Sequence, residues 1–99
     1  MEIAYEGLKN VMKINVNGRI GNNDVMKFQE AVFSAVESYN KVILDFKELV
    51  YMNSAGLRVL LASMKNITHT EKKLIIRNVC SEINELFQMT GFDDILMIE

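Results

Sequence analysis

The most constraining feature of the sequence is a short, almost continuously apolar run at residues 42–46, Val-Ile-Leu-Asp-Phe, between two longer amphipathic segments. Before this run, apolar side chains follow helical spacing from Phe28 to Tyr39. After it, a second helical stripe extends from Leu57 to Ile67. Such a run is typical of a central strand that is buried on both faces. A strand between two helices requires crossover connections, so the sequence predicts an α/β fold with a largely parallel sheet.

Further elements are predicted on both sides of this unit. The predicted strands are residues 2–6, 11–16, 42–46, 74–77 and 95–98, and the predicted helices begin near Asp24, Ser54 and Ser81. Asn23 or Asp24 can cap the first helix, Ser81 can cap the third, and Gly91 is placed to end it. Residues 47–53 are predicted to be a connection. The first two strands form an antiparallel hairpin, which gives the order β-β-α-β-α-β-α-β.

Length and charge restrict the class of protein. The 99 residues fit one domain, residues 1–99, and the formal net charge of −2 argues against a nucleic-acid binder. No apolar run is long enough for a membrane span, and the first residues do not have the pattern of a signal peptide. Cys80 is the only cysteine, so no intramolecular disulfide is possible and a cytoplasmic location is expected.

Catalytic and metal-binding patterns are hard to find. His69 lies in a polar stretch without a second ligand at useful spacing, and Cys80 has no base or orienting group suggested beside it. The adjacent acids Asp93 and Asp94 are typical of a solvated loop. The glycines before the first helix do not form a phosphate-binding loop. We therefore expect no enzyme activity, no metal and no cofactor.

One polar segment, Asn53-Ser54-Ala55-Gly56, separates the central strand and its connection from the second helix. Asparagine and serine are common residues at helix N-caps, so Asn53 or Ser54 is expected to cap the helix. Gly56 is expected to let the first turn approach a neighbour closely. Taken alone, these residues predict only a capped helix start.

Residues 42–61 nevertheless resemble the signature of the STAS domain family, the anti-sigma factor antagonists. The positions that match the family pattern are Ile43, Leu44, Asp45, Leu49, Tyr51, Met52, Ser54, Ala55, Gly56 and Leu57. The flanking segments Gly18-Arg19-Ile20 and Thr90-Gly91-Phe92 are also similar to the family, and they come in the right order. The resemblance implies a STAS-like mixed sheet with the helices packed mainly on one face.

The resemblance also implies a function. In the family, the serine at the Ser54 position is phosphorylated by an anti-sigma factor that is a serine kinase with a histidine-kinase-like ATPase fold. The unphosphorylated antagonist binds this kinase and so releases a sigma factor, and a PP2C-type phosphatase restores the serine. The residues implied to contact the partner are Tyr51, Met52, Asn53, Ser54, Ala55, Gly56 and Arg58. Gly56 is further expected to keep the first turn bare, so that a kinase can reach Ser54.

Other functions within the family are alternatives. A STAS-type domain can be a scaffold, a subunit of a lipid-transport ABC system, or a nucleotide-sensing module. Such relatives often lack the serine that is present here as Ser54, which favours the antagonist. Many relatives have aspartate immediately before the serine, whereas this chain has Asn53, which keeps a capping oxygen but carries no charge.

Overall fold

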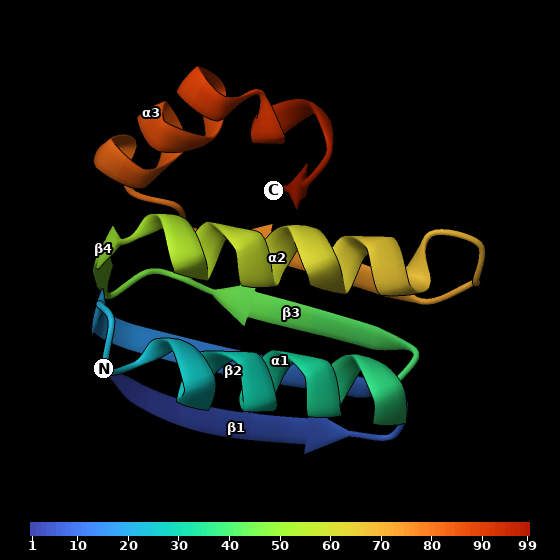
Figure 1. Ribbon diagram of the computed structural model, residues 1–99. Helices are drawn as coiled ribbons and strands as arrows, with labels where there is room; N and C mark the ends of the chain where they lie inside the picture. The colour runs from blue at the N-terminus through green and yellow to red at the C-terminus, as the bar shows by residue number, and fades with distance from the viewer.

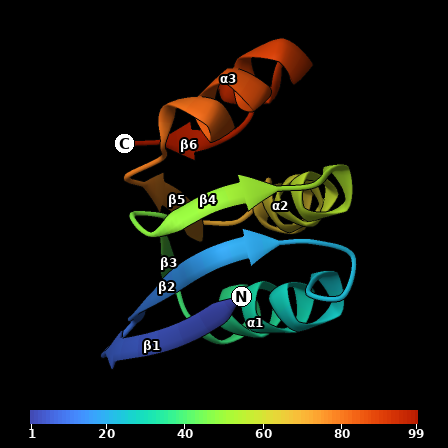
Figure 2. The ribbon, with the colours of Figure 1, turned by 90° about the vertical axis from the view of Figure 1, so that its left-hand side faces the viewer.

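In the computed structural model, which describes residues 1–99, six strands form one sheet, and α1 and α2 lie across one of its faces (Figures 1 and 2). The strands are β1 (Glu2–Leu8), β2 (Val11–Ile20), β3 (Lys41–Asp45), β4 (Leu49–Met52), β5 (Lys73–Arg77) and β6 (Met97–Ile98). The helices are α1 (Val25–Ser38), α2 (Ser54–Ile67), α3 (Ser81–Thr90) and the 3₁₀ turn η1 (Phe92–Asp94). Figure 1 shows α3 at the opposite end of the sheet from β1.

The sheet is mixed, as predicted. Its strand order is β1-β2-β3-β5-β6, and β4 pairs with β2 away from this path. β1 and β2 form the predicted antiparallel hairpin, and every other pairing is parallel. The predicted α/β fold, with helices mainly on one face, is therefore confirmed.

The core lies between the sheet and the two covering helices. Because side chains alternate along a strand, neighbouring strands in register place matching rows on one face. One such row is Ile14, Leu44 and Ile76, all of them buried. The ring of Phe46, directly after β3, packs against Phe28 of α1 with 6.5 Å between ring centroids. The apolar run and the first helical stripe were thus correctly assigned to the core.

The segment predicted as a connection, residues 47–53, contains the strand β4, so that prediction is wrong. Leu49 and Met52 are buried while Val50 and Tyr51 between them are exposed, which is not the alternation of an ordinary half-buried strand. What fixes the strand is its partner, because β4 takes up backbone groups of β2 that β3 leaves open.

The partner strand β2 is also longer than the predicted 11–16. It extends to Ile20 through a register shift between Gly18 and Arg19, where Gly18 has φ +92°. That backbone conformation favours glycine, and the Gly18 N–H donates to the Glu48 carbonyl at 2.8 Å. The glycine therefore bends the strand toward β4 instead of ending it.

Two helix caps differ from the predictions. Asp24 precedes α1, but its carboxylate accepts the Gly21 N–H at 3.0 Å and closes a turn instead of capping the helix. Cys80 is the N-cap of α3, and Ser81 is the first residue inside that helix. Gly91 ends α3 in the left-handed conformation with φ +78°, as predicted. A serine interior to α2, Ser63, falls outside the predicted apolar stripe but is fully buried.

The burial of Ser63 and the short last strand each have a local cause. The Ser63 hydroxyl donates to the Val59 carbonyl one turn back, at 2.8 Å, which satisfies it inside the core. The strand predicted at residues 95–98 is only Met97–Ile98, because the 3₁₀ turn η1 and Ile95 occupy the segment before it. Leu96 is nevertheless buried, so the apolar pattern at this position correctly indicated burial but not the length of the strand.

Asp45 ends β3 beneath the corner that leads to β4. Its carboxylate accepts the Lys47 backbone N–H and the Asn78 side-chain amide, each at 3.0 Å, and lies 3.4 Å from the Lys13 ammonium. Burial acts to raise the pKa of Asp45, but the Asn78 and Lys47 hydrogen bonds and the Lys13 charge together outweigh it and lower this pKa. The corner is therefore stabilised by an ionised carboxylate.

Asp45→Asn is expected to lower the free energy of unfolding by about 1–2 kcal/mol near neutral pH, because a neutral amide is a weaker acceptor than a carboxylate. A lowered folded-state pKa means that this stabilisation is present above the unfolded value of about 3.9 and is lost as the pH falls through the folded value. Urea denaturation across the acid range measures this difference. A difference between the two proteins that stays constant through the acid range would contradict the assignment.

Candidate functional site

The segment singled out by the sequence lies where β4 ends and α2 begins (Figure 2). Asn53 joins the two elements with an extended backbone, φ −84° and ψ 176°, and Ser54 is the first residue of the helix. The Asn53 N–H donates to the Ile20 carbonyl at 3.0 Å, which continues the pairing of β4 with β2. The sheet therefore holds the first turn of α2 in place from below.

Asn53 is the N-cap of α2. Its Oδ1 accepts the Gly56 N–H at 2.9 Å, and its backbone carbonyl accepts the Leu57 N–H at 3.2 Å. Of the two predicted caps, Asn53 is thus the correct one. Ser54 is exposed and does not serve as the cap, so its hydroxyl is available for other chemistry.

The residues predicted to contact a partner divide by exposure. Tyr51, Ser54 and Arg58 are exposed, and Tyr51 retains 40% of its accessible surface. Asn53 and Ala55 are half-buried. Since Ser54 and Arg58 are four residues apart on a helix, their side chains lie on the same face. These five residues form one continuous surface around the start of α2, which we call the Ser54 surface.

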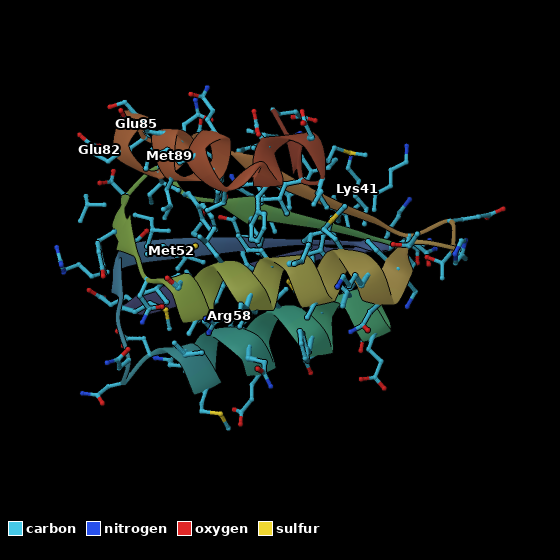
Figure 3. All side chains as sticks on the ribbon, turned by 45° about the horizontal axis from the view of Figure 1, so that its top comes forward. Lys41, Met52, Arg58, Glu82, Glu85 and Met89 are labelled. Atoms are coloured by element: carbon cyan, nitrogen blue, oxygen red, sulfur yellow. The ribbon has the colours of Figure 1, made fainter.

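Met52 and Gly56 are buried beneath this surface, near the start of α2, and Figure 3 shows the position of Met52. Met52 retains only 2% of its accessible surface, so it supports the surface from within. A Cβ on Gly56 would lie 2.8 Å from Met52 Cγ and 3.2 Å from Ile20 Cγ2. The expected close approach at Gly56 is confirmed. The expectation that Gly56 keeps the outer side of the turn bare is wrong, because Gly56 faces the core.

Two arginines give the Ser54 surface positive charge. The Arg19 guanidinium of β2 stacks over the Tyr51 ring, 4.3 Å from the ring centroid, and Arg58 is exposed on α2. Neither arginine takes part in an ion pair. Arg19 is 32 positions before Tyr51, so only the pairing of β2 with a strand that the sequence did not reveal brings the two together.

A groove of about 320 Å³ runs between the Ser54 surface and α3. Its lining residues are Val50, Tyr51, Met52, Asn53, Ser54, Glu82, Ile83 and Leu86. The last three come from α3 and were missed by the sequence reasoning, since no motif links them to Ser54. Val50, one of the lining residues, keeps 58% of its surface accessible. The groove therefore extends the candidate site from α2 onto α3.

Glu82 contributes a negative charge on the α3 side of this groove. Hydrogen bonds from its own backbone N–H and from the Cys80 side chain lower the pKa of Glu82, and Ser81 adds to the effect. Glu85 does not line the groove and lies on the outer side of α3 in Figure 3. Glu82 is thus the one charged residue that lines the groove, while the positive charges of Arg19 and Arg58 lie outside its lining, on β2 and α2.

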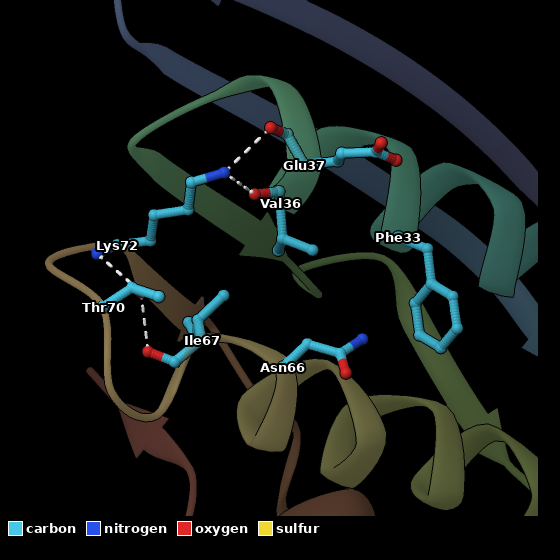
Figure 4. Close-up of a pocket in the computed structure, with 7 residues that line it drawn as sticks. All are labelled: Phe33, Val36, Glu37, Asn66, Ile67, Thr70 and Lys72. Atoms are coloured by element: carbon cyan, nitrogen blue, oxygen red, sulfur yellow. Dashed lines mark hydrogen bonds between the residues drawn. The ribbon is translucent and has the colours of Figure 1, made fainter.

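A second hollow, of about 330 Å³, lies between α1 and α2 near their C-terminal ends (Figure 4). The ammonium group of Lys72, which lines this hollow, is already hydrogen-bonded, because Nζ donates to the Val36 and Glu37 carbonyls at 2.7 and 2.8 Å. These are the last carbonyls of α1, which a cation stabilises. Thr70 likewise donates to the Ile67 carbonyl at 2.7 Å. The hollow is therefore explained by helix capping.

The other residues considered from the sequence do not converge. His69 is exposed, Cys80 is a half-buried free cysteine, and Asp93 and Asp94 lie exposed in η1. No group of three or more His, Cys, Asp or Glu side chains is arranged to hold a metal ion. None of the helices combines the length and the apolar character that crossing a membrane requires.

Comparison with known proteins matches nearly the whole chain to one family. The family model of the STAS domain matches residues 2–99. The chain is similar to the anti-sigma-B factor antagonist of Staphylococcus aureus, with 23% identity over 87 residues that cover 87% of this chain and 81% of the relative.

Solved structures share the fold. An anti-sigma factor antagonist from Mycobacterium paratuberculosis superposes with a TM-score of 0.87 at 18% identity, covering 98% of this chain and 83% of that one. The Bacillus cell fate determinant SpoIIAA in its phosphorylated form superposes with a TM-score of 0.76 at 19% identity, covering 99% of this chain and 91% of that one. At these identities the likeness establishes the architecture alone.

Proposed function

The chain belongs to the STAS domain family, and from that premise we propose that it is an anti-sigma factor antagonist, a binding protein and not an enzyme. In the proposed cycle, the unphosphorylated form captures an anti-sigma factor that is also a serine kinase with a histidine-kinase-like ATPase fold. Capture releases the sigma factor that this kinase holds. Phosphorylation of Ser54 then ends the capture, and a PP2C-type phosphatase removes the phosphate.

The observation that carries this proposal is the position of Ser54. It is an exposed serine at the family's phosphoacceptor position, on a helix turn that Asn53 caps and Met52 supports. In the proposed step, the Ser54 hydroxyl oxygen forms a bond to the γ-phosphorus of ATP, ADP leaves, and the hydroxyl proton passes to a base of the kinase. A relative structure in a phosphorylated form is consistent with such a step.

The fold can accept a phosphate at this position. The first N–H groups of a helix have no partners within the helix. Here the Gly56 and Leu57 N–H groups bond to Asn53, which leaves those of Ser54 and Ala55 free for phosphate oxygens. The positive end of the helix dipole adds a favourable contact of up to about 1 kcal/mol. Phosphorylation therefore acts on the partner interface and not by unfolding the domain.

The charges of the Ser54 surface explain how a phosphate would oppose binding. Arg19 and Arg58 give the β2 and α2 side two positive charges that no ion pair neutralises. A phosphate adds about −1.5 to −2 charges. The modification thus offsets the local positive charge and takes the whole chain from −2 to about −4. A partner that approaches the two arginines with acidic groups would lose this attraction after modification.

The proposal is tested by intact-mass spectrometry of the tagged protein purified from its source organism and incubated with ATP. Wild type is expected to retain a kinase-fold partner and to gain the mass of one phosphate, whereas Ser54→Ala retains the partner without the gain. Ser81→Ala is the matched control, because Ser81 is also exposed and first in its helix. A phosphate gain in Ser54→Ala, or recovery of an ABC-transporter ATPase in place of a kinase, would reject the proposal.

A further inference from the structure

Asn53 is held from three directions. Its backbone N–H donates to the Ile20 carbonyl at 3.0 Å, and its Oδ1 accepts the Gly56 N–H at 2.9 Å. Its Nδ2 donates to Asn22 Oδ1 at 2.9 Å, which links it to a residue 31 positions earlier. The last contact is the only one of the three that reaches a separate loop, the turn between β2 and α1.

The turn that carries Asn22 is itself closed. The Gly21 N–H donates to the Asp24 carboxylate at 3.0 Å, and the Asp24 N–H donates back to the Gly21 carbonyl at 3.0 Å. Asn22 lies between these residues and is exposed, so core packing does not account for its position. Its side chain instead lies against the residue that immediately precedes Ser54.

The oxygen and the nitrogen of the Asn53 side-chain amide have different hydrogen-bond partners. The oxygen caps α2, and the NH₂ group reaches Asn22. An aspartate at position 53 would supply the oxygen but no donor. With asparagine at position 53, one side chain thus both caps α2 and donates to the β2–α1 turn.

We propose that Asn22 is a positioning residue for Ser54 that acts through Asn53. With the Asn22–Asn53 contact in place, the capping side chain is fixed on both sides and the Gly56 N–H stays bonded. Without it, the cap rotates more freely and the turn that carries Ser54 opens more often. The consequence for phosphorylation rests on the function proposed above, whereas the local ordering does not.

Hydrogen exchange at single amides tests the ordering without any partner. In Asn22→Ala, the Gly56 N–H is expected to exchange roughly two- to ten-fold faster than in wild type, the range for loss of one exposed hydrogen bond. Asn23→Ala is the matched control, since Asn23 is exposed on the same turn without a hydrogen bond to Asn53. Equal exchange in the Asn22→Ala and Asn23→Ala proteins would overturn the proposal.

Charge substitution gives an independent test of the contact. Asn53→Asp alone is tolerated, because the Asn22 amide can turn and donate to the new carboxylate. Asn22→Asp alone is tolerated, because Asn53 Nδ2 can donate to it. The double variant places two carboxylates at the contact, and they repel. The fold-increase in the unfolding equilibrium constant of the double variant should exceed the product of the fold-increases of the two single variants by about five-fold or more. Simple multiplication of the single changes would overturn the proposal.

The kinase reaction tests the consequence. Asn22→Ala is expected to lower kcat/KM for Ser54 phosphorylation by about three-fold or more relative to Asn23→Ala, because a cap that rotates more freely holds the Ser54 hydroxyl less precisely for attack. Faster Gly56 exchange with an unchanged kcat/KM would mean that Asn22 orders the turn without positioning Ser54, and the proposal would be wrong. If no kinase modifies wild type, the proposed function fails, and the exchange and charge tests still decide the ordering.

Discussion

A protein that carries phosphoserine at position 54 is expected to bind the anti-sigma factor at least about a hundredfold more weakly than the unmodified protein. The physical reason is that the phosphate offsets the positive charges of Arg19 and Arg58, so that the acidic groups of the partner are left in the interface without a counter-charge. An uncompensated charge in an interface costs several kcal/mol, and each 1.4 kcal/mol is a factor of about ten in affinity. Phosphoserine incorporated during translation, followed by isothermal titration calorimetry, measures the difference directly.

Substitutions at the same position separate charge from shape. Ser54→Asp adds one negative charge and is expected to weaken binding less than phosphoserine but more than Ser54→Ala, which keeps nearly the wild-type affinity. Ser34→Asp is the control for added charge, because Ser34 is exposed on α1 outside the Ser54 surface. Binding of the phosphorylated protein with wild-type affinity would contradict the switch. An equal loss of affinity in the Ser34→Asp variant would show that the weaker binding depends on the net charge of the chain and not on the position of the added charge.

Most of the fold could be predicted because its pattern is local. The run at residues 42–46 is apolar at nearly every position, and the stripes of α1 and α2 repeat over three or more turns. Gly91 was also placed correctly, since a glycine directly after the last turn of a helix favours the left-handed conformation that ends it. Each of these signals lies within one element, so no knowledge of distant neighbours was needed.

The strand β4 and the extension of β2 could not be predicted for the opposite reason. β4 has four residues, of which only Leu49 and Met52 are buried, and its strand character depends on pairing with Gly18–Ile20. The glycine that usually signals a turn instead permits the bend that brings β2 to β4. A single sequence does not contain the register of two segments that lie thirty residues apart.

The residues of the candidate site also differ in how well the sequence predicts them, for the same reason. The motif predicted the start of α2 and left its cap open between Asn53 and Ser54, which are adjacent in sequence, and the structure shows that Asn53 is the cap. Arg19, Asn22 and the α3 side of the groove come from other elements, and only the folded sheet brings them to Ser54. The surface proposed to bind a partner is thus formed by tertiary contacts around a residue that the local sequence identifies.

Gly56→Leu is expected to lower the free energy of unfolding by about 3 kcal/mol or more, and Gly56→Ala by about 1–3 kcal/mol. Two effects oppose each other in the alanine variant. Alanine is favoured over glycine inside a helix by about 1 kcal/mol. Its Cβ, however, would lie 2.8 Å from Met52 Cγ and 3.2 Å from Ile20 Cγ2, both in buried side chains. Because these neighbours are packed on all sides, we expect the steric cost to outweigh the gain in helix propensity. Urea denaturation measures the change.

Truncation of Met52 tests whether the close contact is the cause. In a Met52→Ala background the 2.8 Å contact is absent, so Gly56→Ala should cost clearly less than it does in wild type, by about 0.5–3 kcal/mol. Gly21→Ala is the control, since a Cβ there meets only the Asp24 carboxylate at 3.7 Å and should change stability by less than about 0.5 kcal/mol. The same cost for Gly56→Ala in both backgrounds would place the strain elsewhere.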